Sequence, residues 1–293
     1  MKSTHLQQSR ILINSLPKSG THLLTKAIEI FDYKEYSTNR GYIKRVSDAI
    51  GFSTPKYFNY RQAKDSQKKK SKADTKIAIG AFTPYFVNQP TMQYWLDTIP
   101  YGQYIQGHIP FNSALTPIIT GLNYRHLVII RDPRAVVASL IPFILNAQSS
   151  GMGTHFLYDD FKSMSITQQL HFILEGGHAS KANVEVTSFI DVYQSILAWR
   201  NEPNCLLVRF EDLIGEQGGG NTEKQANVVK ELAEYLNINF DNKITAKLNQ
   251  IYNPSARTFR IGKIDSWKDS IDKKNIEYLI EYCAEICNEA GYI

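Results

Sequence analysis

Residues 10–31 read RILINSLPKSGTHLLTKAIEIF, and this stretch indicates the fold class. The apolar run 10–15 is typical of a strand buried on both faces. The apolar residues of 22–31 recur with the spacing of one helix face, so we expect a helix there. Pro17 and Gly20 mark the turn between the two elements. A strand, a loop and a helix in this order are the beginning of an α/β domain.

The same order of elements recurs along the chain. We expect further strands at 104–106, 126–130 and 206–210, and further helices at 133–145, 187–200, 222–236, 242–251 and 272–290. Strands that alternate with helices predict an α/β fold with a parallel central sheet flanked by helices. A chain of 293 residues suits one large domain, so we expect a single domain over 1–293.

A polar segment at about 40–76 interrupts this order, and we interpret it as a basic insertion. It holds eleven Lys or Arg and three Asp or Glu, whereas the whole chain has a formal net charge of +5. Such a charge run is typical of a solvated loop. The alternative is that it attracts an anionic substrate or surface.

The composition predicts a soluble globular protein, with 43% hydrophobic and 21% charged residues. No apolar run approaches the ~18 residues that span a bilayer, and residues 1–10 lack the apolar core of a signal peptide. We therefore expect a cytoplasmic location. Three cysteines, Cys205, Cys283 and Cys287, favour neither a disulfide framework nor a structural zinc site. Cys283 and Cys287 are expected to share one buried helix face.

Residues 16–22, LPKSGTH, form a candidate anion-binding loop between the first strand and its helix. Backbone N–H groups at a helix N-terminus favour a phosphate, and Lys18 would add a full positive charge. Ser19 and Thr21 would add hydroxyl donors. The lysine precedes the glycine, whereas a Walker A loop has Gly-Lys-Ser/Thr, so a nucleoside triphosphate site is disfavoured. A plain strand-to-helix turn is the alternative.

Residues 131–139, RDPRAVVAS, form a second candidate anion site, where the third expected strand ends and a helix begins. In an open α/β sheet, ligands bind at the carboxyl ends of the strands. Arg131 could make forked contacts to a phosphate, and Ser139, two turns along the helix, could face the same group. The alternative is that Arg131 and Arg134 form surface ion pairs.

Together the two motifs resemble those of the sulfotransferases that use 3′-phosphoadenosine 5′-phosphosulfate (PAPS) and release adenosine 3′,5′-bisphosphate (PAP). Residues 17–21 look like the loop that binds the 5′-phosphosulfate in this family. Arg131 and Ser139 look like its pair of 3′-phosphate ligands. The resemblance implies the P-loop NTPase-like sulfotransferase fold.

Two later segments extend the resemblance to residue 268. Residues 259–268, FRIGKIDSWK, resemble a family segment in which Arg260 and the backbone near Gly262 would bind the 3′-phosphate. Residues 209–213, RFEDL, resemble a strand-end segment that places Phe210 beside the adenine. The cofactor-binding residues that the resemblance implies are Lys18, Ser19, Gly20, Thr21, His22, Arg131, Ser139, Phe210, Arg260 and Gly262.

Residues 107–110, GHIP, follow the second expected strand and resemble the family's His-Leu-Pro segment, whose histidine is the general base. An unperturbed pKa of ~6.5 allows a histidine to accept a proton near neutral pH. A lone histidine is more often structural, so the resemblance is what gives His108 this role. Lys18 is the second implied catalytic residue, because it would stabilise charge on the leaving phosphate.

Four residues depart from the family's pattern, and one of them is Phe210, which replaces a Tyr that contacts the adenine. Gln106 stands where cytosolic members often carry Lys, and Leu23 stands where a Trp packs on the adenine. Asp265 replaces the second glycine of the last segment. These departures leave the phosphate sites better matched than the adenine pocket.

The resemblance implies an enzyme that transfers a sulfuryl group from PAPS to a hydroxyl or amine of a small-molecule acceptor, with no metal and no nucleic-acid partner. Two alternatives start from the residues alone. One is a nucleotide or small-molecule kinase with a variant P-loop. The other is a basic non-enzymatic protein that binds nucleic acid or another anion through 40–76.

Two stretches, 40–76 and roughly 146–180, are expected to shape the acceptor site as mobile loops. The second stretch contains Gly151, Gly153, Gly176 and Gly177 and could form a lid.

Overall fold

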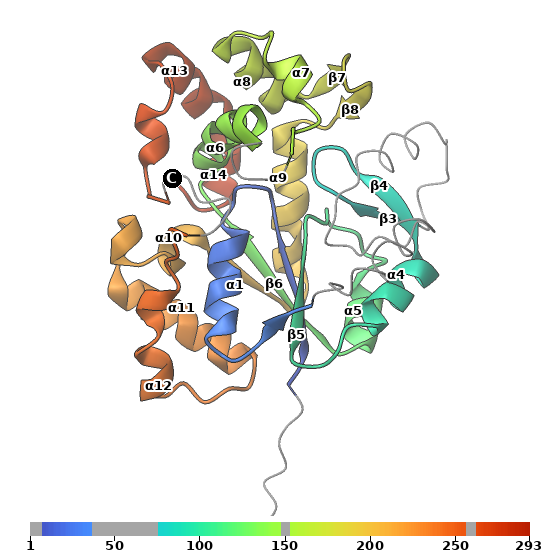
Figure 1. Ribbon diagram of the computed structural model, residues 1–293, viewed down its shortest axis with the longest axis vertical. Helices are drawn as coiled ribbons and strands as arrows, with labels where there is room; N and C mark the ends of the chain where they lie inside the picture. The colour runs from blue at the N-terminus through green and yellow to red at the C-terminus, as the bar shows by residue number, and fades with distance from the viewer. Residues whose placement is uncertain (1–7, 37–75, 148–152, 256–261) are drawn as a thin grey trace, which may run out of the picture.

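The computed structural model describes residues 8–36, 76–147, 153–255 and 262–293, and its centre is a five-stranded sheet (Figure 1). The strand order is β2-β5-β1-β6-β9, and every neighbouring pair is parallel. These strands are β1 (Arg10–Ser15), β2 (Lys34–Glu35), β5 (Gln103–Gly107), β6 (Tyr124–Ile130) and β9 (Cys205–Arg209). The predicted parallel sheet is therefore confirmed.

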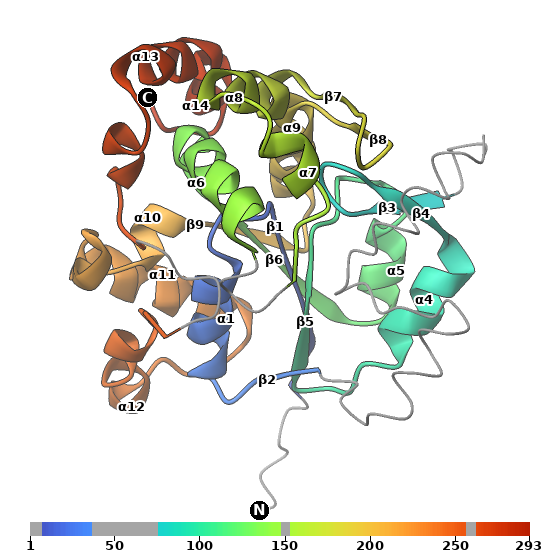
Figure 2. The ribbon, with the colours of Figure 1, turned by 45° about the horizontal axis from the view of Figure 1, so that its top comes forward.

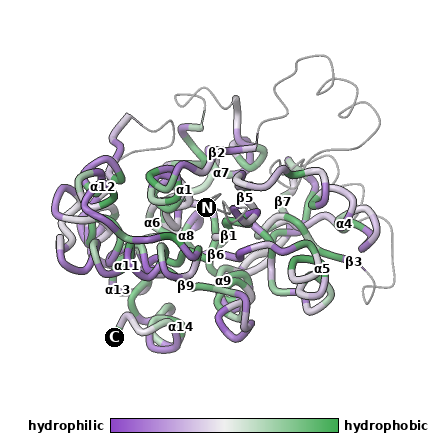
Figure 3. The backbone as a smooth tube through the Cα atoms, turned by 90° about the horizontal axis from the view of Figure 1, so that it is seen from below, coloured by the Kyte–Doolittle hydropathy of each residue, from purple (hydrophilic) through white to green (hydrophobic). Residues whose placement is uncertain are grey.

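Helices cover both faces of this sheet. One hydrophobic cluster joins it to α1 (Thr21–Glu29), α10 (Phe210–Leu213), α11 (Thr222–Tyr235) and α12 (Asn242–Thr245). The other cluster joins it to α4 (Gln89–Asp97), α5 (Thr116–Gly121), α6 (Pro133–Asn146), α7 (Tyr158–Phe161), α8 (Ile166–Glu175), α9 (Phe189–Leu197), α13 (Lys273–Tyr282) and α14 (Ala284–Glu289). Seen from below in Figure 3, α11 and α12 lie on one side of the strands and α4 and α5 on the other.

The side chains of β1 explain why the sheet is covered twice. Ile11 and Ile13 belong to the cluster around α1, whereas Leu12 belongs to the other cluster. This is the period of two that a pleated strand imposes. Because both sets are apolar, each face of the strand is buried only when helices pack on it.

The first residues after four of the strands meet at one edge, because parallel strands all end on the same side of a sheet. β1 leads into the loop with Lys18, β5 into His108, β6 into Arg131 and β9 into Phe210. The sheet therefore gathers four of the residues that the sequence singled out.

Two small hairpins lie outside the central sheet and were not predicted (Figure 2). They pair β3 (Lys76–Ile79) with β4 (Tyr85–Asn88), and β7 (Gly177–Ala179) with β8 (Val184–Val186). The predicted insertion at 40–76 lies outside the described residues, apart from Lys76, which begins β3.

The expectation of loops over 146–180 is wrong for most of the described part of that stretch, which forms α7, α8 and β7, whereas its role as a lid stays a prediction. A capping box of Ser165 and Gln168 begins α8, and its apolar face is buried. The Asp160 carboxylate accepts hydrogen bonds from the backbone N–H groups of Lys181 and Ala182, which ties α7 to the second hairpin. Gly151 lies outside the described residues.

Three other boundaries differ from prediction. Residues 272–290 form two helices, because Cys283 leaves helical geometry, with φ −89° and ψ 1°. Residues 242–251 form α12 and a separate 3₁₀ turn at Leu248–Gln250. Phe210 begins α10 instead of ending β9. Further 3₁₀ turns occupy Ala198–Asn201, Glu216–Gly218 and Ser266–Asp269.

Both C-terminal cysteines are buried, as predicted, although Cys283 lies between α13 and α14 and only Cys287 lies within a helix. Within the described ranges, no helix is both long enough and apolar enough to cross a membrane.

Candidate active site

The loop between β1 and α1 has the backbone of an anion cradle. Lys18 has φ 70° and Gly20 has φ 99°, so two of its residues are left-handed. The first intrahelical hydrogen bonds run from the N–H groups of Leu23 and Leu24 to the Gly20 carbonyl. The N–H groups of Thr21 and His22 therefore precede any intrahelical acceptor and point out of the helix.

Gly20 cannot carry a side chain at this position. A Cβ there would lie 2.5 Å from Cδ2 of Phe210 and 3.3 Å from Cδ1 of Ile129. Ile129 is fully buried, so a Cβ at Gly20 would have to displace the Phe210 ring. The positive φ adds backbone strain for any residue with a Cβ.

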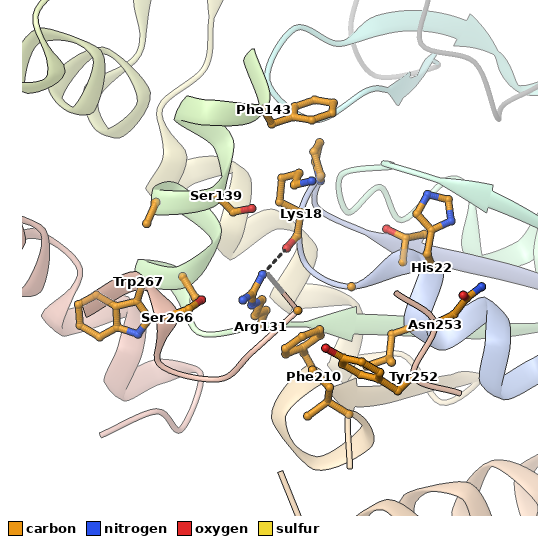
Figure 4. Close-up of a pocket in the computed structure, with 18 of the residues that line it drawn as sticks. Lys18, His22, Arg131, Ser139, Phe143, Phe210, Tyr252, Asn253, Ser266 and Trp267 are labelled. Atoms are coloured by element: carbon orange, nitrogen blue, oxygen red, sulfur yellow. Dashed lines mark hydrogen bonds between the residues drawn. The ribbon is translucent and has the colours of Figure 1, made fainter. Parts of the chain in front are cut away.

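A cavity of about 410 Å³ opens at the carboxyl edge of the sheet (Figure 4). None of the described residues that line it is Asp or Glu. The cavity brings together nine of the residues predicted from the sequence: Lys18, Gly20, Thr21, His22, His108, Arg131, Ser139, Phe210 and Gly262.

Two predicted residues are not part of this lining. Ser19 is buried beside the cavity, and its hydroxyl has no hydrogen-bond partner among the described residues. Its backbone N–H donates to the Leu16 carbonyl, so it closes the turn. Arg260 lies outside the described residues, and its role stays a prediction.

Arg131 joins three segments of the site. Its guanidinium donates to the backbone carbonyl of Lys18 at 3.3 Å (Figure 4) and to that of Lys263 at 3.4 Å. It also lies 4.4 Å from the centre of the Phe210 ring. Hydrogen bonds of this length are weak, so an anionic group could replace them at little cost.

Arg134 makes the ion pair that was the alternative interpretation for both arginines. Its guanidinium donates to both carboxylate oxygens of Asp132, at 2.9 and 2.8 Å. Asp132 also caps α6 by accepting from the Arg134 backbone N–H. The two arginines therefore differ in role, because Arg131 turns towards the cavity.

His108 has a defined tautomer. Its Nδ1 lies 2.8 Å from the Ser15 carbonyl oxygen, which can only accept, so Nδ1 carries the proton. In the neutral ring Nε2 is then a proton acceptor. Burial lowers the pKa of His108 below its usual value of 6.5, the hydrogen bond to Ser15 opposes this, and nearby His22 adds to the lowering. His108 is thus a neutral base at pH 7.

Lys18 and Gln106 have neighbours in the site that the sequence motifs did not include. The Lys18 ammonium lies 4.7 Å from the centre of the Phe143 ring on α6. The Gln106 side-chain amide donates to the Glu35 carboxylate at 2.6 Å. A carboxylate therefore holds the amide that stands in the place of the family's lysine.

The comparisons with known proteins agree with this geometry. The family model described as "Sulfotransferase domain" matches residues 8–291. The chain belongs to the sulfotransferase family. It is therefore an enzyme that uses PAPS, which replaces the kinase and non-enzymatic alternatives.

Three solved structures share the fold and are distant in sequence. The mouse sulfotransferase SULT7A1 complexed with PAP is 16% identical, with a TM-score of 0.55 over 95% of this chain and 84% of that chain. Retinol dehydratase in complex with androsterone and inactive cofactor PAP is 13% identical, with a TM-score of 0.52 over 96% and 81%. Retinol dehydratase in a complex with retinol and PAP is 13% identical, with a TM-score of 0.51 over 96% of this chain and 82% of that chain. A search of curated proteins found no significant match.

The donor set of this sulfotransferase suits PAPS, whose phosphate and sulfate groups are anionic. Lys18 and Arg131 bring two permanent cations, and the first turn of α1 brings backbone N–H groups. With no carboxylate among the described lining residues, little opposes the binding of an anion.

The sequence analysis missed a group of residues that line the cavity beside Phe210. Tyr252 and Asn253 line the cavity from the segment after the Leu248–Gln250 turn, and Figure 4 shows Tyr252 next to Phe210. Ile214 and Ile251 add apolar surface there. No periodicity marks this segment. Its only signal is its position between two recognised motifs.

Replacing Gly20 by alanine tests the cradle. We expect Gly20→Ala to lower the melting temperature and to weaken PAP binding by about tenfold or more. A strain of ~1.4 kcal/mol in the loop is enough to change an affinity tenfold. Gly121→Ala is the control, because a Cβ at Gly121 meets no atom within 4 Å. Calorimetric titration with PAP measures both variants. Normal affinity and stability of Gly20→Ala would contradict the cradle.

Proposed function

We propose that this cavity is the active site for transfer of a sulfuryl group from PAPS to a hydroxyl or amine of a small-molecule acceptor. One observation carries the proposal. Lys18, His108 and Arg131 follow three different strands, yet all three line one cavity. A cation at a phosphate loop, a neutral base and a second cation are the groups that this reaction requires.

The binding of PAPS would divide between two ends of the cavity. Lys18 and the N–H groups of the first turn of α1 would hold the 5′-phosphosulfate. Arg131 would exchange its two long carbonyl contacts for charge-assisted bonds to the 3′-phosphate, with Ser139 as a hydroxyl donor. We also assign Gly262 and Arg260 to the 3′-phosphate.

The apolar wall next to Arg131 suits the adenine. Phe210 and Tyr252 present aromatic rings, and Asn253 presents an amide that can donate and accept. This pair of rings would stand in for the tryptophan that Leu23 replaces.

His108 would act on the acceptor, while PAPS supplies the sulfuryl group. Nε2 of His108 would take the proton of the acceptor as its oxygen or nitrogen forms a bond to sulfur. Lys18 and the backbone N–H groups of the loop would stabilise the negative charge that develops on the phosphate oxygen as its bond to sulfur breaks. Each of these groups is in place before the reaction begins.

Two substitutions separate the base from the binding site. We expect His108→Ala to lower kcat by ~10²–10⁴-fold, the usual contribution of a general base, with PAP affinity kept. Arg131→Ala should instead weaken PAP binding by roughly 10- to 100-fold, since a hydrogen bond to a charged group contributes ~1.5–3 kcal/mol.

Steady-state kinetics with labelled PAPS and calorimetry with PAP measure both variants. Near-normal turnover of His108→Ala would remove His108 from the mechanism, and unchanged PAP affinity of Arg131→Ala would remove Arg131 from the phosphate site.

The pH dependence of kcat/KM reports the base in the free enzyme. Because the folded pKa of His108 is lowered, the ring stays neutral as pH falls through 6.5 and protonates only at lower pH. We therefore expect the acidic limb of kcat/KM to have its midpoint below pH 6.5. Rates measured from pH 4.5 to 9 test this, and a midpoint at pH 7 or above would contradict it.

A further inference from the structure

We infer that Asn14 is a positioning residue that fixes the orientation and the tautomer of His108. The inference rests on the proposed function, in which His108 is the base. Asn14 is fully buried in the central strand β1, where a polar side chain needs partners. The hydrogen-bond partners of its side chain are Ile109, which follows His108 in the chain, and Ser15, whose carbonyl contacts the His108 ring.

The Asn14 side chain continues the β1–β5 ladder beyond its last pair. Asn14 pairs in register with Gly107, and β5 ends there. Beyond that point the Asn14 Nδ2 donates to the Ile109 carbonyl at 2.9 Å, and its Oδ1 accepts from the Ile109 N–H at 2.8 Å. One side chain thus holds both polar groups of the residue after His108.

The same oxygen also holds the residue that fixes the ring. Oδ1 of Asn14 accepts from the Ser15 N–H at 3.0 Å, and the Ser15 carbonyl accepts from Nδ1 of His108 at 2.8 Å. Asn14 therefore connects the backbone beyond His108 to the carbonyl that selects its tautomer. The Ser15 hydroxyl, 2.6 Å from that of Thr21, links this group to the phosphate loop.

Only an amide satisfies these partners. Two N–H donors face one atom of the Asn14 side chain and a carbonyl faces the other, which also fixes which atom is nitrogen. An aspartate would place a second oxygen against the Ile109 carbonyl. An alanine would leave the buried Ile109 N–H without the acceptor that Asn14 supplies.

Other contacts hold the same backbone without replacing Asn14. The Trp199 Nε1–H donates to the Ile109 carbonyl at 2.9 Å, and the Gly80 N–H donates to the His108 carbonyl at 2.8 Å. Neither contact reaches Ser15. Ser15 itself is held by its pairing with Ile129 in β6, so Asn14 acts on the other side of the contact, where it sets the position of the His108–Ile109 backbone relative to the Ser15 carbonyl.

We expect the loss of Asn14 to lower the turnover number and to leave the affinity for PAP unchanged. A ring that loses Nδ1–H would present a donor at Nε2, which cannot take a proton from the acceptor. Lys18 and Arg131 make no hydrogen bond to Asn14 among the described residues, so the phosphate sites would remain.

The experiment compares Asn14→Asp and Asn14→Ala with Gln169→Glu. Gln169 is a buried amide on α8 that donates to the Phe161 and Met164 carbonyls, so its change to Glu is the same loss of a buried donor away from His108. The three variants and the wild type are measured for thermal stability, PAP affinity, kcat and the His108 tautomer, by ¹⁵N NMR of labelled histidine. Asn14→Ala introduces no buried charge, so it provides the test if the Asn14→Asp variant does not fold.

We expect the Asn14 variants to keep PAP affinity within about threefold and to lose kcat by roughly 10- to 100-fold, part of what a general base contributes. The NMR signature of Nδ1–H in His108 should weaken in them and persist in Gln169→Glu. Normal kcat in a folded Asn14 variant, an unchanged His108 tautomer, or a loss of kcat matched in Gln169→Glu would each overturn the inference.

His108→Ala, measured in parallel, separates this outcome from failure of the proposed function. If His108→Ala is inactive and the Asn14 variants are normal, only the positioning role is wrong. If His108→Ala remains active, the base assignment fails first and the positioning role fails with it.

Discussion

The burial of β1 on both faces and along both edges is the constraint on which the structure depends. Its backbone pairs with β5 on one side and β6 on the other, and its side chains fill two hydrophobic clusters. The only charged residue of β1 is Arg10 at its amino end, which pairs with Asp97, and the rest of the strand is uncharged because an unpaired buried charge is too costly. The cations and the base therefore lie just beyond the strand ends, where the sheet brings them to one edge.

The site at that edge combines positive charge with a rigid frame. Lys18 and Arg131 lie close together because the Arg131 guanidinium contacts the Lys18 carbonyl, and Gly20 allows Phe210 to pack against the loop. The Asp132–Arg134 pair caps α6 and leaves Arg131 directed at the cavity. These contacts hold the cationic groups in place before an anion binds, which is the condition for electrostatic catalysis.

Much of this arrangement could be predicted from the sequence, because its signals are local. The strands are continuous apolar runs, and the Lys18 and Arg131 segments each lie between a strand and a helix. The residues that were missed come from contacts between distant segments. Tyr252 and Phe143 reach the cavity only through the packing of α11, α12 and α6, and neither lies in a motif.

The prediction of a loop over 146–180 failed because it was based on composition. The glycines of 146–180 favoured a loop, but buried apolar residues on α8 and the two backbone contacts of Asp160 order the described part of that stretch. The role of Ser19 as a phosphate donor stays a prediction, and its hydroxyl is buried beside the cavity with no partner among the described residues. A motif specifies the backbone of such a loop better than the direction of each side chain.

A crystal structure of the PAP complex is expected to show the 5′-phosphate within ~3 Å of Lys18 and the N–H groups of the first turn of α1, and the 3′-phosphate on Arg131 and Ser139. PAP bound with its 3′-phosphate away from Arg131, or outside this cavity, would contradict this assignment.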